Sequence, residues 1–462
     1  MKNLLRKLFP RKIRARYDAA QTNSENAAHW SMATAFNADQ EMTSAVRAKL
    51  RNRARYETMN NPWLQGMIQT QASDLIGTGP RLQIIGGDEN RNTEIERAFN
   101  DWCRQIQLAD KLRVSRMTQS RDGESFILLV TNDNLPGKVK LDLMLIDPER
   151  VAAPWSQIDT DDDNQADGVF FDELGRPVKY NILRQHPAVG FDNGTPHYFP
   201  AEQVIHFFRQ ERPEQHRGVP EISAALPMIA LLRRYTLAMV KKMESSANIS
   251  GVLETTDVEQ GEGDELTPWK EFPLPRDTFA AMPRGWKLNQ YSLQNPTDTQ
   301  LDFALQVKVE SARCLSLPKN VALGDSSGYN YASGRLDFQS YDKFLKVERE
   351  RISILCLDRI FPEWMAEYDP YGEVPLHSWH WDGRAHVDPT REANAEQIRL
   401  ANKTLTLAEA CASEGRDWHV VLRQRILEEA AERDMRKELG LPPAVAQGQA
   451  NNSNQDKDDD DE

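Results

Sequence analysis

Cysteine is scarce in this sequence of 462 residues. The four cysteines, Cys103, Cys314, Cys356 and Cys411, lie far apart and form no C-x-x-C pair. Disulfide-bonded secreted scaffolds and thiolate metal sites need closely spaced or numerous cysteines. The cysteine pattern therefore argues against both and favours reduced thiols in a cytoplasm.

Long apolar runs are also missing. The longest, residues 226–232, contains Pro227 and stops at Arg233 and Arg234, whereas a membrane-spanning helix needs about 20 apolar residues. The basic start, MKNLLRKLFPRKIRARY, has no apolar stretch long enough for a signal peptide. We therefore expect neither a membrane span nor a secretory signal.

Positive charge is in deficit, because 57 Lys and Arg face 70 Asp and Glu and the formal net charge is −13. Affinity for phosphates comes from clustered Lys and Arg, so this total disfavours a protein that wraps nucleic acid. The two ends differ from the rest: residues 1–17 carry seven basic residues and no acid, and residues 456–462 are almost entirely acidic. Their composition predicts solvated, disordered tails, with contacts to charged partners as the alternative.

The common nucleotide and zinc motifs are absent: the sequence has no P-loop, Rossmann fingerprint, zinc-finger spacing or RNP motif. An acidic run at 159–168 lacks the glycine and glutamate that a calcium loop requires. A cluster of His and Asp at 377–388 alternates with tryptophan as an amphipathic strand would. We therefore expect no cofactor and no metal.

One string could carry catalysis. Residues 324–328, G-D-S-S-G, fit the G-x-S-x-G pattern in which Ser326 would be a nucleophile. That nucleophile needs a strand before it and a helix directly after it, and neither flank suits here. A flexible loop is favoured, and a cytoplasmic serine hydrolase using Ser326 is kept as the alternative function.

Periodicity predicts an α+β protein of two to four domains or one elongated subunit. Helical segments are predicted at 42–76 with a break at 60–62, 94–107, 219–246, 298–315, 335–361 and 388–440. Pro362 should kink or end the fifth of these. Strands are predicted at 77–87, 125–130, 138–146, 168–183 and 203–208, with a hairpin turn at Gly175. Residues 247–296 are rich in Gly and Pro and contain short strand candidates. The sequence therefore predicts a small module between two helices, one that leads away from the rest of the chain and one that leads back.

Several strings, in order, resemble the lambda-type portal proteins of tailed bacteriophages. The strings are Asn60-Asn61-Pro62, Gly77-Thr78-Gly79, Gly123-Glu124-Ser125-Phe126, Leu145-Ile146-Asp147-Pro148-Glu149, Gly175-Arg176-Pro177-Val178, Val204-Ile205-His206, Arg217-Gly218-Val219-Pro220, Asn330-Tyr331-Ala332-Ser333 and Val387-Asp388-Pro389. Together they cover roughly residues 45–430. The loop at 316–334 departs from the family pattern at Tyr329 and at G-D-S-S-G.

The resemblance implies an elongated portal-type subunit and a division of the chain. The implied parts are a basic N-terminal arm (1–44), an α/β wing (45–218), a first stem helix (219–246), a clip (247–297), a second stem helix (298–315), a tunnel loop (316–334), a long kinked helix with the wing return (335–387), a helical crown (388–440) and an acidic disordered tail (441–462).

The resemblance also implies a function without catalysis. Twelve copies would form a ring at one capsid vertex, in the virion and, during assembly, in the host cytoplasm. Double-stranded DNA would pass through the axial channel without sequence specificity, packaged by the terminase large subunit and later ejected. The other implied partners are the major capsid protein, the scaffold protein and a head–tail adaptor.

The tunnel loop supplies the predicted DNA-facing residues, which are Lys319, Asn320, Tyr329, Asn330 and Tyr331, with ordinary subunit packing as the alternative. A sliding duplex requires weak contacts, since tight phosphate binding would stall it. If part of the negative charge lined the channel, it would repel the duplex and keep it moving. Lysines added to channel-facing stem residues should then impair packaging or ejection.

Overall fold

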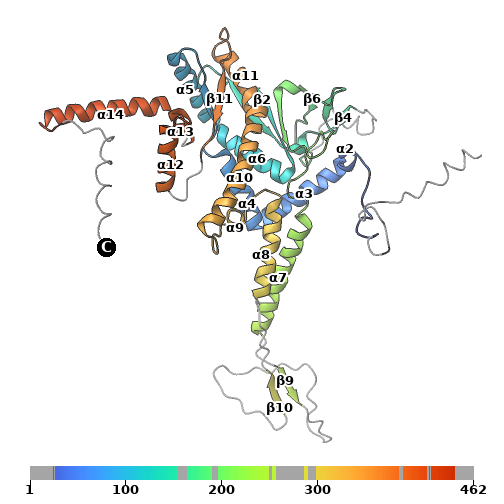
Figure 1. Cartoon of the computed structure of the whole chain (residues 1–462). Helices are drawn as coiled ribbons and strands as arrows, with labels where there is room; N and C mark the ends of the chain where they lie inside the picture. Colours follow the sequence, from blue (N-terminus) through green and yellow to red (C-terminus); the bar gives the residue numbers. More distant parts are fainter. Residues whose placement is uncertain are drawn as a thin grey trace, which may run out of the picture.

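The computed structural model describes residues 24, 27–153, 164–189, 196–248, 252–255, 286–289, 298–383, 389–413, 416 and 418–442. Within these ranges the chain is a mixed α+β protein, as predicted. A central body of helices and sheets carries a projecting pair of helices below and a group of helices to one side (Figure 1). In the part that is described, no helix is long and apolar enough to cross a membrane.

The body begins with two helices separated at the predicted break. Helix α3 (Ser44–Asn60) ends because Pro62 restricts Asn61 to an extended conformation, with φ −121° and ψ 103°. Pro62 is then the first residue of α4 (Pro62–Ile76), where a missing amide hydrogen costs nothing. Helix α4 ends at Gly77, whose φ of +57° suits glycine.

A three-stranded antiparallel sheet with the order β3-β2-β8 lies at the centre of the body. Its strands are β2 (Glu124–Thr131), β3 (Leu141–Ile146) and β8 (Val204–Phe208). Alternate residues of β2 enter different cores: Ile127 packs into the main core and Phe126 into a smaller second one. The sheet is therefore buried on both faces over much of its length, and Glu124 at the start of β2 is removed from water.

Two further sheets cover the sides of the body. The strands β4 (Gln165–Ala166), β5 (Val169–Phe171), β6 (Pro177–Asn181) and β7 (Tyr198–Pro200) pair in that order. The predicted hairpin is confirmed, and Gly175 has a φ of +76° in its turn. Strand β1 (Arg81–Ile84) pairs with β11 (His377–His380), which confirms the strand predicted from the alternating tryptophans.

The helix predicted at 94–107 is longer than expected. Helix α5 (Glu89–Gln105) starts five residues earlier, where the side chain of Asp88 accepts a hydrogen bond from the amide of Asn90. A second helix that we did not predict, α6 (Leu108–Asp122), follows at once. Its buried face includes polar residues such as Arg116, which hides the apolar periodicity.

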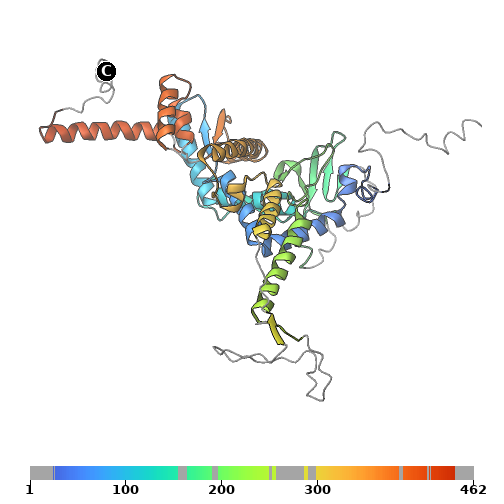
Figure 2. The ribbon, with the colours of Figure 1, turned by 60° about the horizontal axis from the view of Figure 1, so that its bottom comes forward.

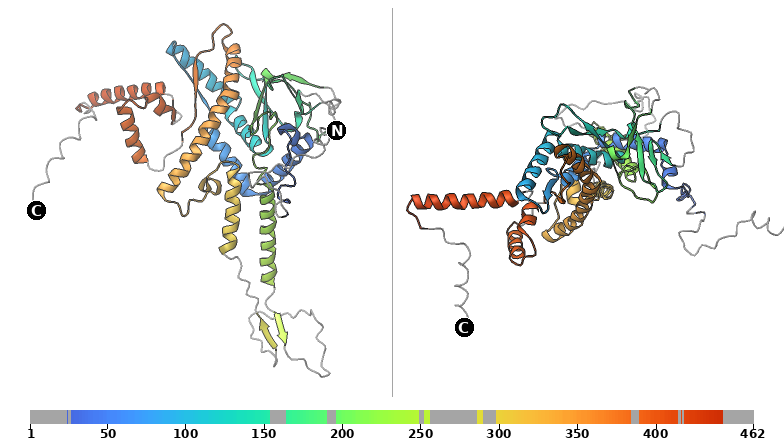
Figure 3. Two further views of the ribbon diagram at one scale, coloured as in Figure 1. Left: turned by 45° about the vertical axis from the view of Figure 1, so that its right-hand side comes forward. Right: turned by 90° about the horizontal axis from the view of Figure 1, so that it is seen from above.

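Two antiparallel helices leave the body side by side (Figures 1 and 3). Helix α7 (Leu226–Asn248) starts seven residues later than predicted, after a series of turns, and α8 (Asp298–Arg313) returns. The rings of Tyr235 and Phe303 meet edge to face with centroids 6.1 Å apart. At the far end, β9 (Val252–Thr255) pairs with β10 (Trp286–Asn289), as the two short strand candidates predicted.

The long helix after α8 differs from the prediction at both ends. Helix α10 (Tyr331–Ile352) begins four residues before Arg335 because Asn330 and Ser333 form a capping box. Pro362 does not end the helix. A π-helical segment (Ser353–Leu357) changes the hydrogen-bond pattern one turn before the proline, and α11 (Asp358–Tyr368) continues through it.

The C-terminal helices lie at one side of the body (Figure 2). Helices α12 (Pro389–Ala401), α13 (Leu407–Ser413) and α14 (Trp418–Glu438) lie in the segment 388–440 that was predicted to be helical, and a capping box begins α13. The amide of Glu409 donates to the Thr406 hydroxyl over 3.2 Å, and the amide of Thr406 donates to the Glu409 carboxylate over 2.9 Å. Asp388 lies outside the described residues.

Candidate functional site

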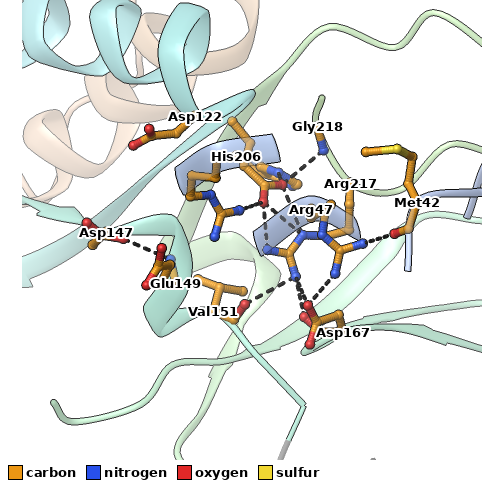
Figure 4. A network of polar contacts seen from close by, with 12 residues as sticks. Met42, Arg47, Asp122, Asp147, Glu149, Val151, Asp167, His206, Arg217 and Gly218 are labelled. Carbon is orange, nitrogen blue, oxygen red and sulfur yellow. Dashed lines mark hydrogen bonds and ion pairs between the residues drawn. The ribbon is translucent and has the colours of Figure 1, made fainter. Parts of the chain in front are cut away.

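Several strings that are far apart in the sequence meet in one buried network of charges (Figure 4). Glu124, at the start of β2, is fully buried at its centre. The guanidinium of Arg217 donates to both of its carboxylate oxygens, at 2.7 and 2.9 Å, and the amide of Gly218 donates over 3.0 Å. Residues 217–218 are thereby fixed to the central sheet immediately before the turns that lead into α7.

Helix α3 brings three arginines to this network from one face. Arg47, Arg51 and Arg55 are four residues apart, so their side chains lie along the same side of the helix. Arg51 donates to Glu124 over 3.0 Å, and Arg47 pairs with Asp167. Arg55 holds three carboxylates, two of them in the segment 147–149, which gave one of the quoted strings: Asp122, Asp147 and Glu149.

The charges in the network stabilise one another. Burial acts to raise the pKa of Glu124, but the charge of Arg217 and hydrogen bonds from His206 and Arg217 outweigh it and hold that pKa well below its ordinary value. Burial lowers the pKa of His206, whose ring stacks on Phe126 with centroids 4.2 Å apart. Glu124 is therefore ionised and His206 neutral at neutral pH. The network holds together the chain segments that meet in it.

A second buried ion pair joins α6 to the segment before α7. Arg116 of α6 donates to both carboxylate oxygens of Glu221 over 2.8 and 3.0 Å, and both side chains are 2% exposed. The hydroxyl of Ser120 donates to Glu221 and to the buried amide oxygen of Gln71. Gln71 in turn donates to the carbonyl of Leu315, just after α8, over 2.6 Å. One polar network thus ties the bases of both α7 and α8 to the body.

Two glycines allow the segment before α7 to approach the sheet. A Cβ atom on Gly218 would lie 2.2 Å from the carbonyl oxygen of Gly123, and one on Gly123 would lie 2.5 Å from the carbonyl carbon of Val219. Gly123 also has a φ of +94°, in the left-handed region. This close approach explains why the strings around Gly123 and Gly218 carry glycine.

The residues predicted to face DNA are not all in a loop. Lys319 and Asn320 begin the short helix α9 (Lys319–Leu323), which packs against α4 and α8, and Asn320 is only 7% exposed. The prediction of a loop throughout 316–334 is therefore wrong for α9 and for the start of α10. Because Asn320 is buried in α9, its side chain does not lie on the surface that a duplex could reach.

The other predicted residues lie around the start of α10. The hydroxyl of the half-buried Tyr329 donates to Asp337 over 3.0 Å, and the exposed Asn330 caps the helix. Tyr331 is the first residue of α10, and its side chain lies outside the described residues. Of the predicted residues, Lys319 and Tyr329 are thus half-buried and Asn330 is exposed.

Ser326 does not sit on a nucleophile elbow. It lies in an exposed turn after helix α9, where an elbow requires a strand. Asp382 and His386 follow Ser326 in the chain order of a Ser-Asp-His triad. Both carboxylate oxygens of Asp382 accept hydrogen bonds from Thr78, and His386 lies outside the described residues. The arrangement does not support a serine hydrolase. Among the described residues no cluster of His, Cys, Asp and Glu could hold a metal ion.

The buried network was missed in the sequence, although two signals pointed to it. The arginines of α3 repeat every four residues, and Glu124, His206 and Arg217 all stand in strings quoted for the family resemblance. The sequence could not pair them, because Arg51 and Glu124 are 73 residues apart and meet only in the folded chain.

Comparisons with known proteins point to the same family as these strings. The family model described as phage portal protein, lambda family, matches residues 23–349. A probable portal protein of the Halomonas phage phiHAP-1 is 22% identical over 434 residues, which cover 85% of this chain and 81% of that protein.

Two solved structures are also similar in outline. A chain from the neck of the native gene transfer agent particle, computed with C12 symmetry, has 14% identity and a TM-score of 0.48 and covers 87% of this chain and 95% of its own. A chain from the neck of the empty particle, computed with C6 symmetry, has 17% identity and a TM-score of 0.46, over 83% and 91%.

The family model spans well over half of the sequence, and the relative described as a probable portal protein covers 85% of it. The chain therefore belongs to the lambda family of phage portal proteins, which are structural components of the virion.

Proposed function

We propose that twelve copies of this chain form a ring around an axial channel through which double-stranded DNA is packaged and later ejected. In this ring α7 and α8 are the stem helices, residues 247–297 the clip, 45–218 and 335–387 the wing, and 388–440 the crown. The terminase motor and then the head–tail adaptor bind at the clip, and capsid and scaffold proteins surround the wing. The chain itself performs no catalysis.

The observation that carries this proposal is the exposed apolar surface of the projecting helices. Leu237 and Val240 of α7 are each 56% exposed, and Leu301 and Phe303 of α8 are 62% and 50% exposed. A soluble chain rarely leaves such a patch in water unless a partner covers it. In a ring, each subunit offers two different surfaces to its two neighbours, so α7 of one copy can cover α8 of the next.

A stem that carries load needs a rigid base, and the buried network provides one. Glu124 and Arg217 hold the segment before α7, and Gln71 holds the carbonyl after α8. Buried, multiply hydrogen-bonded charge pairs resist displacement because each partner left alone would be a desolvated charge. Movement of the DNA through the ring would then leave the stem helices in place.

The charge of the stem supports weak contact with DNA. Helices α7 and α8 together carry six basic and four acidic residues, so the acidic excess of the chain does not lie on them. Nearly balanced charge neither grips the phosphates nor repels them strongly. Sparse contacts from Lys319 at the start of α9 and Asn330 at the start of α10 would then guide the duplex, and Tyr329 and Tyr331 remain candidates beside them.

Acidic substitutions in the stem test this proposal. We expect the double variant Leu237→Glu/Val240→Glu to remain folded as a monomer but to lose ring formation, because unlike the native residues the carboxylates cannot be buried against a neighbour. Negative-stain imaging counts the rings, and circular dichroism checks the fold. The matched control is Val189→Glu, at a 78% exposed valine outside the stem. Rings of normal abundance in the stem variant would contradict the proposal.

A further inference from the structure

A groove with a volume of about 1170 Å³ lies between the long helix and the β5–β6 hairpin. Helix α10 and the π-helical segment contribute Val347, Glu350 and Ile354 to one wall, and the hairpin contributes Glu173 and Leu174 to the other. In Figure 1 the hairpin and α2 (Ala38–Glu41) lie on one side of the body, with α10 towards its centre. Of the buried network described above, His206 also lines the groove.

The walls of the groove carry apolar side chains that nothing in the described part of the chain covers. Leu174, Val347 and Ile354 are 77%, 66% and 55% exposed. Three large aliphatic side chains around one concavity are typical of a binding surface rather than of scattered surface residues. The groove therefore requires a ligand with apolar side chains.

The groove is also acidic on balance, since its lining carries six carboxylates against three arginines, Arg209, Arg351 and Arg359. Glu173, Glu214 and Glu350 line it, are exposed, and form no ion pair with any residue that the structure describes. The buried Glu348 is different, because Arg209 and Arg351 both pair with it. A ligand for this groove should therefore carry positive charge, which excludes a DNA duplex.

The N-terminal arm of the chain has both properties. Its first 17 residues contain seven Lys and Arg and no acid, together with five large apolar residues, Leu4, Leu5, Leu8, Phe9 and Ile13. Opposite charges on arm and groove would attract each other at a range set by the ionic strength. The aliphatic residues of the arm would cover those of the groove.

The chain also leads from the arm to the rim of the groove. Asn37 and Asp39, at the start of α2, line it. Arg212 holds this part of the chain in place through the carbonyl of Phe36, over 2.9 Å, and the carboxylate of Glu41, over 2.6 Å. Nineteen residues, 18–36, connect the arm to this rim, and the seventeen residues of the arm reach about 55 Å when extended, so the arm is long enough to enter the groove.

We propose that residues 1–17 bind in this groove, with their basic side chains on Glu173, Glu214 and Glu350 and their apolar side chains on Leu174, Val347 and Ile354. The arm would then cover the exposed face of α10 and join the N-terminus of the chain to its long helix. A neighbouring copy of the chain is the competing occupant.

Photo-cross-linking in the full-length chain tests the contact directly. A photoreactive amino acid in place of Val347 should give cross-linked peptides that contain residues 1–17, whereas the same group in place of Val420, which is 50% exposed on α14, should not. Cross-links from position 347 only to other segments of the chain, such as the stem or the crown, would overturn the proposal.

Trypsin cleavage tests the charge pairing without a bulky probe. The double variant Glu173→Gln/Glu350→Gln should be cut within residues 1–17 about fivefold faster than the parent chain at low salt, since exposed ion pairs contribute modestly and are lost. The control Glu363→Gln changes an exposed glutamate of α11 outside the groove and should be cut at the parent rate. Equal rates for all three proteins would contradict the proposal.

Discussion

At the scale of single residues, the chain places several ionised groups out of contact with water. Glu124 and Arg217 are 0% and 1% exposed, and the backbone amide of Gly218 and the carbonyl of Val151 complete their hydrogen bonds. An ion pair in such a place depends on further hydrogen bonds to its remaining donors and acceptors. Loss of one member therefore costs far more than loss of a surface pair.

We predict that Glu124→Gln lowers the free energy of unfolding by about 3 kcal/mol, because the buried guanidinium of Arg217 loses its counter-charge. Urea denaturation of the unassembled chain measures this. The control is Asp101→Asn, which removes a pair with Arg104 at 4.0 Å whose side chains are 69% and 84% exposed, and which should cost less than about 1 kcal/mol. Similar losses in the two variants would show that the network does not stabilise the fold.

His206 should make the stability depend on pH. Burial lowers its pKa from the ordinary 6.5, and Arg217 and Arg351 lower it further, against the opposing effect of Glu124. As the pH falls through about 6.5, the unfolded chain therefore takes up a proton before the folded chain does, so stability falls as the pH falls, by at most about 1.4 kcal/mol per unit. His206→Gln should flatten this slope, and His29→Gln, at an exposed histidine, should leave it unchanged. An unchanged slope in His206→Gln would refute the assignment.

At the scale of elements, the packing of the segment before α7 on β2 depends on glycine. We predict that Gly218→Ala destabilises the chain by about 1–3 kcal/mol, because the new methyl group would overlap the carbonyl of Gly123 and the side chain of Glu124. Gly66→Ala is the matched control: Gly66 is inside α4 with no atom within 4 Å of an added Cβ, so alanine should stabilise by up to about 1 kcal/mol. Thermal unfolding distinguishes the two, and the same sign for both would contradict this reading.

Local signals predicted many of these elements, and tertiary contacts decided the rest. Three features depend on residues that are close together in the sequence, and therefore follow from it. They are the break before α4 at Asn61-Pro62, the hairpin turn at Gly175 and the start of α13 at Thr406-x-x-Glu409. Helix α6 was missed because its buried face is partly polar. The pairing of Arg51 with Glu124, and the burial of Asn320 in α9, arise from packing between distant segments, which periodicity does not report.

At the scale of the whole molecule, a single copy of the chain leaves much apolar surface exposed to water. In the described part, α14 has no buried residue, and apolar side chains of α7, α8 and α10 face outward. The net charge of −13 disfavours a protein that wraps DNA, whereas helices α7 and α8 carry a small basic excess. The total therefore argues against a protein that grips DNA and is compatible with one that lets it pass.

The most direct test of this account is the mass of the assembled particle. Native mass spectrometry of the purified full-length chain should give a species of about 634 kDa, twelve times the 52.8 kDa of one chain, and cryo-electron microscopy of the same sample should show a ring with an open axial channel. A chain that remains at 52.8 kDa at every concentration, with no rings, would contradict the central claim.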